Sequence, residues 1–374
     1  MRRRDFLAAT AIAPTLGAAE DSGFVSLFDG KSLKGWTIEQ GPEGAFYVHD
    51  GAIVVHKSAS FPTWLRSDHK YENFDFRGEF YIEGWIDSGI YWSAPDYGRN
   101  TWVGMQMKIF HQADEQPPRN NSMGSLFPLI APSKINVKNQ KAWNDFRIVL
   151  DWPSLKIWTN GELVQDLNCD QRPELRYRLR QGYLGLASLS YPIRFRNLRV
   201  RELPAKEKWQ ILYGDESDWD KWYVSDGTPR FAPVGNVLYG DGVGHLATKE
   251  QFRDFEFRCY VRGIREHNSG VLFRSDGHGN RARHYEIQLH SSEEAHYPTG
   301  SLYHFKRSIY PRIKHEEWFP FHLIVKGKSC MVAVNGDVVC EYDELDNLEA
   351  GHIELQAHST GYWTEFRKIR IKSL

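Results

Sequence analysis

The chain has 374 residues, of which 41% are hydrophobic, 14% aromatic and 25% charged, and its formal net charge is −1. This composition is typical of a globular protein and excludes a disordered chain, and the near-zero charge gives no electrostatic basis for binding nucleic acid or an anionic membrane. The length exceeds what one hydrophobic core normally organises, so we expect two domains.

The N-terminus reads MRRRDFLAATAIAPTLGAA, in which Arg3 and Arg4 precede a short apolar run that ends in small residues. This pattern is typical of a twin-arginine export signal, which we place at residues 1–19. The apolar run is shorter than the roughly 20 residues that a membrane-spanning helix needs. We therefore expect a protein exported to the periplasm or the extracellular space, without a membrane span.

The remaining chain is one sequence pattern written twice. FDGKSLKGW corresponds to YGDESDWDKW, GMQMKIF to YEIQLH, AWNDFRIVL to EWFPFHLIV, and TNGELV to VNGDVV, all in the same order. The period is far too long for a solenoid repeat, so each copy should have its own core. We expect the first copy at residues 23–203, a linker at 204–208 and the second copy at 209–374.

Both copies are predicted to be all-β. Apolar residues alternate with polar ones around Phe74 and Phe76 in the first copy, and around Phe255 and Phe257 in the second. The Asn-Gly pairs at 160–161 and 335–336 each lie between alternating runs and predict β-hairpins. Many short strands with glycine-rich turns favour a β-sandwich or jelly roll in each copy.

The chain has four cysteines and no CxxC motif, which gives no support to a thiolate zinc site. Cys330 and Cys340 flank the second Asn-Gly turn. A regular two-residue hairpin would place Cys340 opposite Met331 and Cys330 on the other face, which disfavours a disulfide. We predict that all four cysteines are unpaired.

Two stretches of the second copy, HYEIQLH (284–290) and HIELQAH (352–358), carry polar residues at every second position. In a strand these residues project from one face. The first face would carry His284, Glu286, Gln288 and His290, and the second His352, Glu354, Gln356 and His358. Asn268 and Arg274, six residues apart, would share a face in the same way. Faces rich in histidine, glutamine and glutamate predict a site, although solvated outer faces remain the alternative.

The first copy lacks most of this polar set. In the alignment of the two copies, Gly104, Gln106 and Lys108 take the places of Glu286, Gln288 and His290. The counterparts of Gln356, His358 and Arg274 are Ala187, Leu189 and Ser93. We therefore expect the working site in the second copy and a degenerate one in the first.

No familiar catalytic motif is present: the chain has no GxSxG, no HExxH and no phosphate-binding loop. Two interpretations of the polar faces stay open. Glu286 and Glu354 could form the acid–base pair of an ordinary glycosidase. Alternatively, a divalent metal could bind to imidazole and carboxylate groups, the candidate ligands being His284, Glu286, His290 and His358.

With these motifs in order, both copies resemble the 3-keto-disaccharide hydrolase domain family, long catalogued as a domain of unknown function. The resemblance rests on LFDGKSLKGW, NSGVLFR, YEIQLH, TGSLY, the Asn-Gly hairpin and the closing IELQAH and FRKIRIKSL, and it spans nearly all of both copies. It implies two tandem concanavalin-like jelly rolls that act on 3-keto-glycosides. Family members carry an acidic residue where this chain has His290.

The resemblance also implies a mechanism. A ketone at C3 acidifies the C2 proton, so a base can remove it and the C1 aglycone can leave. Under this hypothesis His290 or Glu286 is the base, and His358 is the acid or a second polarising group. Arg274 and Gln288 hold the keto oxygen, and a bound metal could replace Arg274 in stabilising the enolate. Asn268, Gln356 and Tyr303 of the TGSLY motif would bind the substrate. The expected partner is an oligosaccharide or glycoside, and the alternative function is that of a non-catalytic, lectin-like carbohydrate-binding protein or a structural β-sandwich protein.

Overall fold

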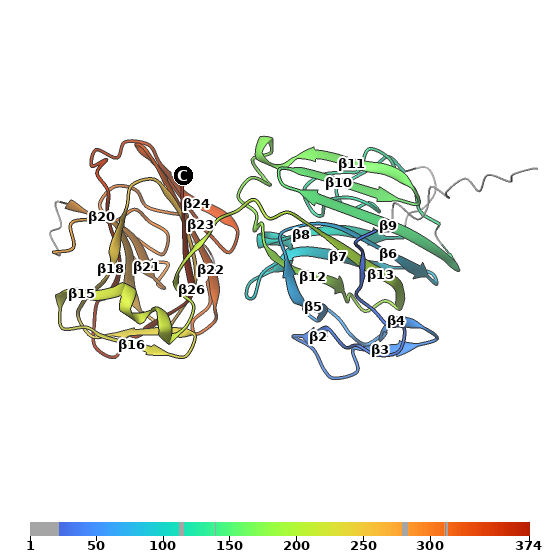
Figure 1. The fold of residues 1–374 in the computed structure, drawn as a ribbon, viewed down its shortest axis with the longest axis horizontal. Coiled ribbons are helices and arrows are strands. Elements are labelled where there is room, and N and C mark those ends of the chain that lie inside the picture. Colours follow the sequence, from blue (N-terminus) through green and yellow to red (C-terminus); the bar gives the residue numbers. More distant parts are fainter. Residues whose placement is uncertain (1–21, 112–115, 139, 279–282, 310, 312) are drawn as a thin grey trace, which may run out of the picture.

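The computed structural model describes residues 22–111, 116–138, 140–278, 283–309, 311 and 313–374. The predicted export signal at residues 1–19 lies outside this set and stays a prediction. The described chain forms two β-sandwiches that lie side by side, the first in blue to green and the second in yellow to red (Figure 1). The prediction of an all-β fold with two tandem jelly-roll sandwiches is confirmed.

Each sandwich of the described chain pairs an eight-stranded sheet with a five-stranded sheet. In the first domain the larger sheet has the order β11 (Glu162–Asn168), β10 (Ser154–Thr159), β9 (Ala142–Asp151), β6 (Asn73–Ile82), β13 (Ile193–Leu203), β4 (Ala52–Val55) and β3 (Phe46–His49), with β1 (Val25–Ser26) paired to β13. The smaller sheet has the order β2 (Trp36–Glu39), β5 (Trp64–Tyr71), β12 (Gly182–Ala187), β7 (Asp87–Ala94) and β8 (Met105–Phe110).

The second domain repeats this arrangement. Its larger sheet has the order β16 (Arg230–Val234), β17 (Val237–Asp241), β26 (Thr364–Ser373), β19 (Phe255–Gly263), β22 (Phe319–Lys326), β23 (Ser329–Val334) and β24 (Asp337–Tyr342), with β14 (Gln210–Tyr213) paired to β26. Its smaller sheet has the order β15 (Trp222–Gly227), β18 (Gly244–Phe252), β25 (Gly351–Ala357), β20 (Asn268–Ser275) and β21 (Tyr285–His290).

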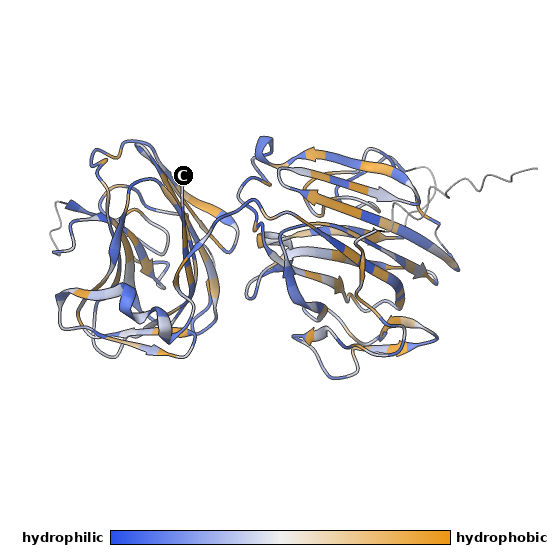
Figure 2. Ribbon diagram, viewed as in Figure 1, coloured by the Kyte–Doolittle hydropathy of each residue, from blue (hydrophilic) through white to orange (hydrophobic). Residues whose placement is uncertain are grey.

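The alternating sequence pattern fills the space between the two sheets of each sandwich. Phe74 and Phe76 are fully buried in the first core, and Phe255 and Phe257 are fully buried in the second. Figure 2 shows the resulting alternation of hydrophobic and hydrophilic residues along the strands. Burial of these large side chains, at about 1.5–3 kcal/mol each, is the main force that holds each sandwich together.

Both Asn-Gly pairs form the expected hairpins, and both residues of each pair have positive φ, as a type I′ turn requires. The prediction for Cys340 is wrong, because a β-bulge between Val332 and Ala333 shifts the register and places Cys340 opposite Val332. Cys330 and Cys340 therefore both point into the second core. All four cysteines are free and buried, as predicted.

Helical structure is scarce in the part of the chain that the structure describes. It consists of α2 (Asn100–Val103) and the short 3-10 turns η1 (Cys169–Gln171) and η2 (Glu216–Lys221). Helices of this kind are too short to cross a membrane, and no described helix meets the length and hydropathy that a membrane span needs.

Candidate functional site

The outer face of the five-stranded sheet of the second domain carries a pocket of about 390 Å³. Tyr285, Ile287 and Leu289 of β21 point into the core, while the intervening Glu286 and Gln288 line the pocket. The period-two pattern therefore places the polar residues as the sequence analysis expected. Seven of the predicted site residues line this pocket: Asn268, His284, Glu286, Gln288, Tyr303, Gln356 and His358.

Glu286 lies flat across the neighbouring strand β20. Its position opposite Leu272 aims the side chain over Gly270, where a Cβ would come within 2.4 Å of the Glu286 carboxylate oxygen. Any larger residue at 270 would push the carboxylate away. The glycine of the NSGVLFR motif is thus a requirement of the site.

Amide groups hold the floor of the pocket. The Gln288 amide donates a hydrogen bond of 2.5 Å to Asn268 Oδ1, and a second one to the Ser269 carbonyl. Because Asn268 Oδ1 accepts from Gln288, the Asn268 Nδ2 group is the side that can donate to a ligand oxygen. On β25, the Gln356 amide lies 3.4 Å from Nε2 of His245.

His245 is a pocket residue that sequence reasoning missed. It begins strand β18 with Gly244, and its Nδ1 lies 3.2 Å from Oε2 of Glu354. Glu354 is fully buried and accepts hydrogen bonds from the Ser225 and Ser275 hydroxyls. These hydroxyls and the neighbouring His245 hold the pKa of the Glu354 carboxyl below its usual range despite burial.

The arrangement is a histidine beside a buried carboxylate, with its other ring nitrogen, Nε2, 3.4 Å from the Gln356 amide in the pocket lining. Such a pair can take up a proton, because the carboxylate fixes the ring and stabilises the imidazolium that forms. Glu286 and Glu354 do not form the acid–base pair of an ordinary glycosidase. Glu354 has no exposed surface, and His245, Ser225 and Ser275 surround its carboxylate oxygens. One signal in the sequence could have indicated His245: its counterpart in the first copy is Trp64, so this position differs between the copies as the other site positions do.

Arg274 does not belong to the site, and its predicted role on the keto oxygen is wrong. A register shift between Leu272 and Ser275 and a left-handed φ of 52° at Arg274 break the alternation of β20. The side chain is buried away from the pocket, where it donates to backbone carbonyls and to Asp254. Counting residues across an irregular strand gave the wrong face.

His290 and His358 lie close to each other at one end of the site. His358 lines the pocket and is exposed, with Nδ1 3.0 Å from the Ser359 hydroxyl. His290 lies opposite Asn268, outside the residues that line the pocket, and its Nδ1 accepts from the Ser292 amide. Burial and, secondarily, the nearby His358 lower the pKa of His290. The assignment of His290 as the base therefore has no support from its position.

His352 also lies outside the pocket, since its ring contacts the Thr248 carbonyl at 2.6 Å and the Gln251 amide. The proposed metal ligands do not form a coordination site either. Within the described residues, which include all four candidates, no three His, Cys, Asp or Glu side chains come close enough together to hold a metal ion.

The sheet registers correct the alignment of the two copies. Asp87 pairs with Phe110 in the first domain, as Asn268 pairs with His290 in the second. The counterparts of Glu286, Gln288 and His290 are thus Gln106, Lys108 and Phe110, two residues later than the sequence alignment gave. The close approach of a glycine and a polar side chain agrees with this register. A Cβ at Gly89 would clash with the Gln106 amide, as a Cβ at Gly270 would clash with the Glu286 carboxylate.

Comparison with known proteins gives one family. The model of the 3-keto-alpha-glucoside-1,2-lyase-like domain matches residues 23–201 and again residues 205–372. No curated protein matches the chain.

Several solved structures are similar at low identity. A protein from Parabacteroides distasonis ATCC 8503, provisionally named a glycosyl hydrolase, is 19% identical with a TM-score of 0.44, over 52% of this chain and 99% of its own. The carbohydrate-binding module CBM66 from Bacillus subtilis is 14% identical with a TM-score of 0.32, over 41% of this chain and 96% of its own. A Bacillus subtilis protein of unknown function with a galectin-like fold is 15% identical with a TM-score of 0.36, over 45% and 97%.

Proposed function

Because the chain belongs to the 3-keto-alpha-glucoside-1,2-lyase-like domain family, we propose that its second domain cleaves 3-keto-glycosides, sugars oxidised at C3. Family membership supports a carbohydrate-active protein. The observation that carries the finer proposal is the pairing of His245 with the buried Glu354 at the wall of a pocket lined by amide and carboxylate groups.

The proposed first step is removal of the C2 proton by Nε2 of His245. A C3 ketone makes this proton acidic, since the electron pair left on C2 delocalises onto the keto oxygen. Glu354 stabilises the imidazolium that forms. Asn268 Nδ2, which Gln288 orients, donates to the oxygen on which negative charge develops.

The second step breaks the bond from C1 to the glycosidic oxygen and forms a C1–C2 double bond. The imidazolium of His245 returns the proton to the departing oxygen, so the elimination is balanced in protons and electrons. Addition of water to C1 would then complete a net hydrolysis. Glu286 and Gln356, which line the same pocket, would bind sugar hydroxyls.

Deuterium at C2 of the substrate tests this proposal. With 4-nitrophenyl 3-keto-glucopyranoside that carries deuterium at C2, the released sugar enone should have lost the deuterium. In a second experiment, unlabelled substrate that is recovered unreacted from D₂O should have gained deuterium at C2 if the proton transfer is reversible. Nitrophenol release with the C2 label retained in the sugar would mean direct displacement at C1 and would refute the elimination. Binding of the sugar without any release would favour the lectin-like alternative.

We also propose that the protein is exported by the twin-arginine signal predicted at residues 1–19. The paired Arg3 and Arg4 support this proposal. Replacement of both by lysine should leave the precursor uncleaved in the cytoplasmic fraction, and normal export of that variant would refute it.

A further inference from the structure

The first domain has a pocket of about 210 Å³ at the position equivalent to the site of the second domain. Trp64 occupies the place of His245, Gln106 that of Glu286, and Lys108 that of Gln288. Leu189 replaces His358, and Gly185 replaces the buried Glu354. The first domain therefore lacks the counterparts of His245 and Glu354, the two residues to which we assign proton transfer, yet it keeps an open pocket at this place.

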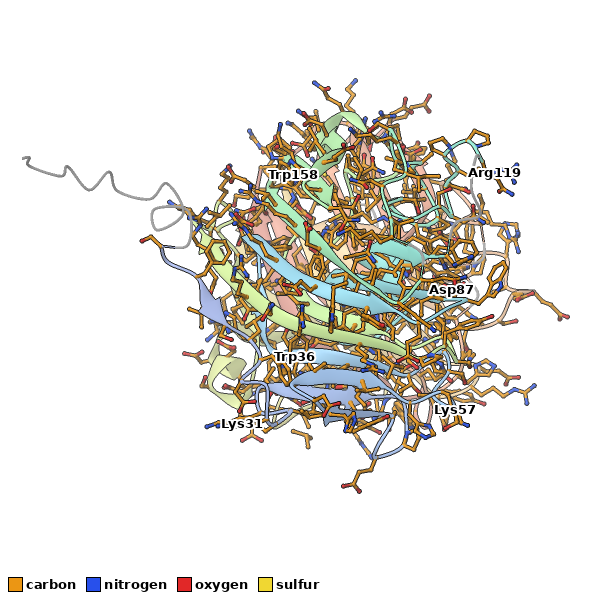
Figure 3. All side chains as sticks on the ribbon, turned by 90° about the vertical axis from the view of Figure 1, so that its right-hand side faces the viewer. Lys31, Trp36, Lys57, Asp87, Arg119 and Trp158 are labelled. Carbon is orange, nitrogen blue, oxygen red and sulfur yellow. The ribbon has the colours of Figure 1, made fainter. Side chains whose placement is uncertain are left out.

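A new polar set has replaced the old one. Lys108 Nζ lies 2.5 Å from Oδ1 of Asp87, which takes the place of Asn268, and the Lys108 side chain is only 5% exposed. Gln106 donates to the Ser88 carbonyl and lies over Gly89. Burial of a lysine is costly unless it is paired, so this ion pair is a built feature of the pocket floor. Figure 3, in which the first domain faces the viewer, shows Asp87 toward one edge of the domain.

Four aromatic residues also line the pocket, and two of them, Trp64 and Tyr91, are each only 5% exposed. Trp64 and Tyr91 meet edge to face with their centroids 5.7 Å apart, and Lys108 Nζ lies 4.3 Å from the centroid of Phe127. Phe61 lines the rim and is 53% exposed. The exposed Phe61 ring beside these hydrogen-bonding groups matches the two kinds of surface on a pyranose, its C–H face and its hydroxyl edge.

A second pocket, of about 240 Å³, continues the first across the sheet. The two share Gln40, Trp64, Gly98 and Asn100 in their linings. The second is polar: Arg66 donates to Glu39 at 2.7 Å, and the Tyr183 hydroxyl donates to Asp96 at 3.1 Å. Together they form a groove with an aromatic half and a polar half that meet at Trp64.

Asp87 pairs with Lys108 and Glu39 with Arg66 within the lining of the groove, and the lining residue Asp96 pairs with Lys70 and Lys368 beside it. The exposed Arg99 at the rim lies over the rings of Phe61 and Trp102. Paired charges present both donors and acceptors without a net field, which suits hydroxyl groups better than an ionised ligand.

We propose that this groove of the first domain binds two consecutive pyranose rings of a neutral oligosaccharide and does not cleave them. The first copy is then a separate binding site whose chemistry differs from that of the second domain. The proposal does not rest on the catalytic one, since it concerns sugars without a C3 ketone and residues that the elimination does not use.

Isothermal titration calorimetry of the full chain tests it with four neutral probes, maltotriose, cellotriose, laminaritriose and xylotriose, and with trigalacturonate as the charged comparison. At least one neutral trisaccharide should bind at one site per chain. Phe61→Ala, at an exposed position that tolerates truncation, and Gly89→Ala, which displaces the Gln106 amide, should each weaken that binding about tenfold or more. Tyr47→Ala removes an aromatic ring of 42% exposure outside the groove and should leave the affinity unchanged.

Gly270→Ala, the same change in the second domain, should also leave this affinity unchanged, which separates the groove from the catalytic pocket. Three results would overturn the proposal: no saturable binding of any neutral probe, unchanged affinity in Phe61→Ala and Gly89→Ala, or tighter binding of trigalacturonate than of every neutral probe.

Discussion

Single residues decide what the second-domain pocket can do. His245 and Glu354 lie on adjacent strands, β18 and β25, and the carboxylate beside the imidazole accepts hydrogen bonds from two serine hydroxyls. Because Glu354 is fully buried, it can act on a ligand only through His245. The chemistry of the site depends on this contact more than on the number of histidines nearby.

Replacing His245 by glutamine, which keeps a polar side chain but cannot take up a proton, should lower kcat on a 3-keto-glucoside about 10²- to 10⁴-fold. Glu354→Gln should lower kcat less, with KM nearly unchanged, because it acts through His245. Steady-state kinetics of both variants checks this. Equal activity of His245→Gln and wild type would show that another group is the base.

A second residue-scale prediction concerns stability against acid. His267 is buried, and burial lowers its pKa from 6.5 to about 4. Between these values the unfolded chain binds a proton that the folded protein does not, so stability is full above pH 6.5 and falls as the pH drops toward 4. His267→Gln should remove about 2 kcal/mol of the loss in unfolding free energy between pH 7 and pH 5.

Urea unfolding at the two pH values measures this difference, with His49→Gln as the control because the His49 side chain is 63% exposed. If His267→Gln and wild type lose the same unfolding free energy on acidification, protonation of His267 is not what destabilises the folded protein.

At the scale of elements, the site depends on register between β20 and β21. Gly270 lies where the Glu286 side chain crosses β20, and Gly89 lies in the same relation to Gln106 on β7. Each sandwich thus has a glycine over which a polar side chain of the neighbouring strand lies, and that side chain is Glu286 in one domain and Gln106 in the other. Under the two proposals, this shared scaffold lets the two copies hold different ligands.

Gly270→Ala should displace the Glu286 carboxylate and reduce kcat/KM for the 3-keto-glucoside by at least about tenfold, because a misplaced group in a reacting complex costs that much or more. The matched control is Gly84→Ala, where an added methyl meets no atom within 4 Å. Thermal melting checks that both variants fold. Full activity in Gly270→Ala would argue against a role for Glu286.

How much of this was predictable from sequence also differs between elements. The regular strand β21 followed its alternation, so the pocket side of Glu286 and Gln288 was predictable. The bulge in β20 misdirected the prediction for Arg274, since an irregular residue changes the face of everything after it. The partner of His245 lies more than 100 residues away on another strand, and only sheet pairing brings the two together. Alignment by letters alone misplaced the first-copy counterparts by two residues.

At the scale of the whole molecule, the two sandwiches are joined by ion pairs across their interface. Asp96 of the first domain contacts Lys368 of the second at 2.5 Å, and Glu207 in the linker contacts Lys372 of the second domain at 2.5 Å and also Arg180 of the first. The Tyr260 hydroxyl accepts from the Asp96 amide. The adjacent Lys70 and Lys368 hold the pKa of Asp96 at about 2 against its burial.

The double change Asp96→Asn and Glu207→Gln should loosen the docking of the domains without unfolding either core. Small-angle scattering should show a larger radius of gyration, and a protease should cut the linker at 204–208 faster. Asp166→Asn, which breaks only the exposed pair with Lys156 within the first domain, is the control. Unchanged scattering and cleavage in the double variant would mean that other contacts hold the domains.

We propose that the second-domain pocket cleaves glycosides only when C3 carries a ketone. Release of nitrophenol from 4-nitrophenyl 3-keto-glucopyranoside and from the unoxidised glucoside, measured side by side in both anomeric forms, tests it most directly. We expect release of nitrophenol from a 3-keto anomer, no release from the unoxidised glucosides, and near-complete loss of release in His245→Gln. Release from the unoxidised glucoside at a comparable rate, or undiminished release in His245→Gln, would contradict it.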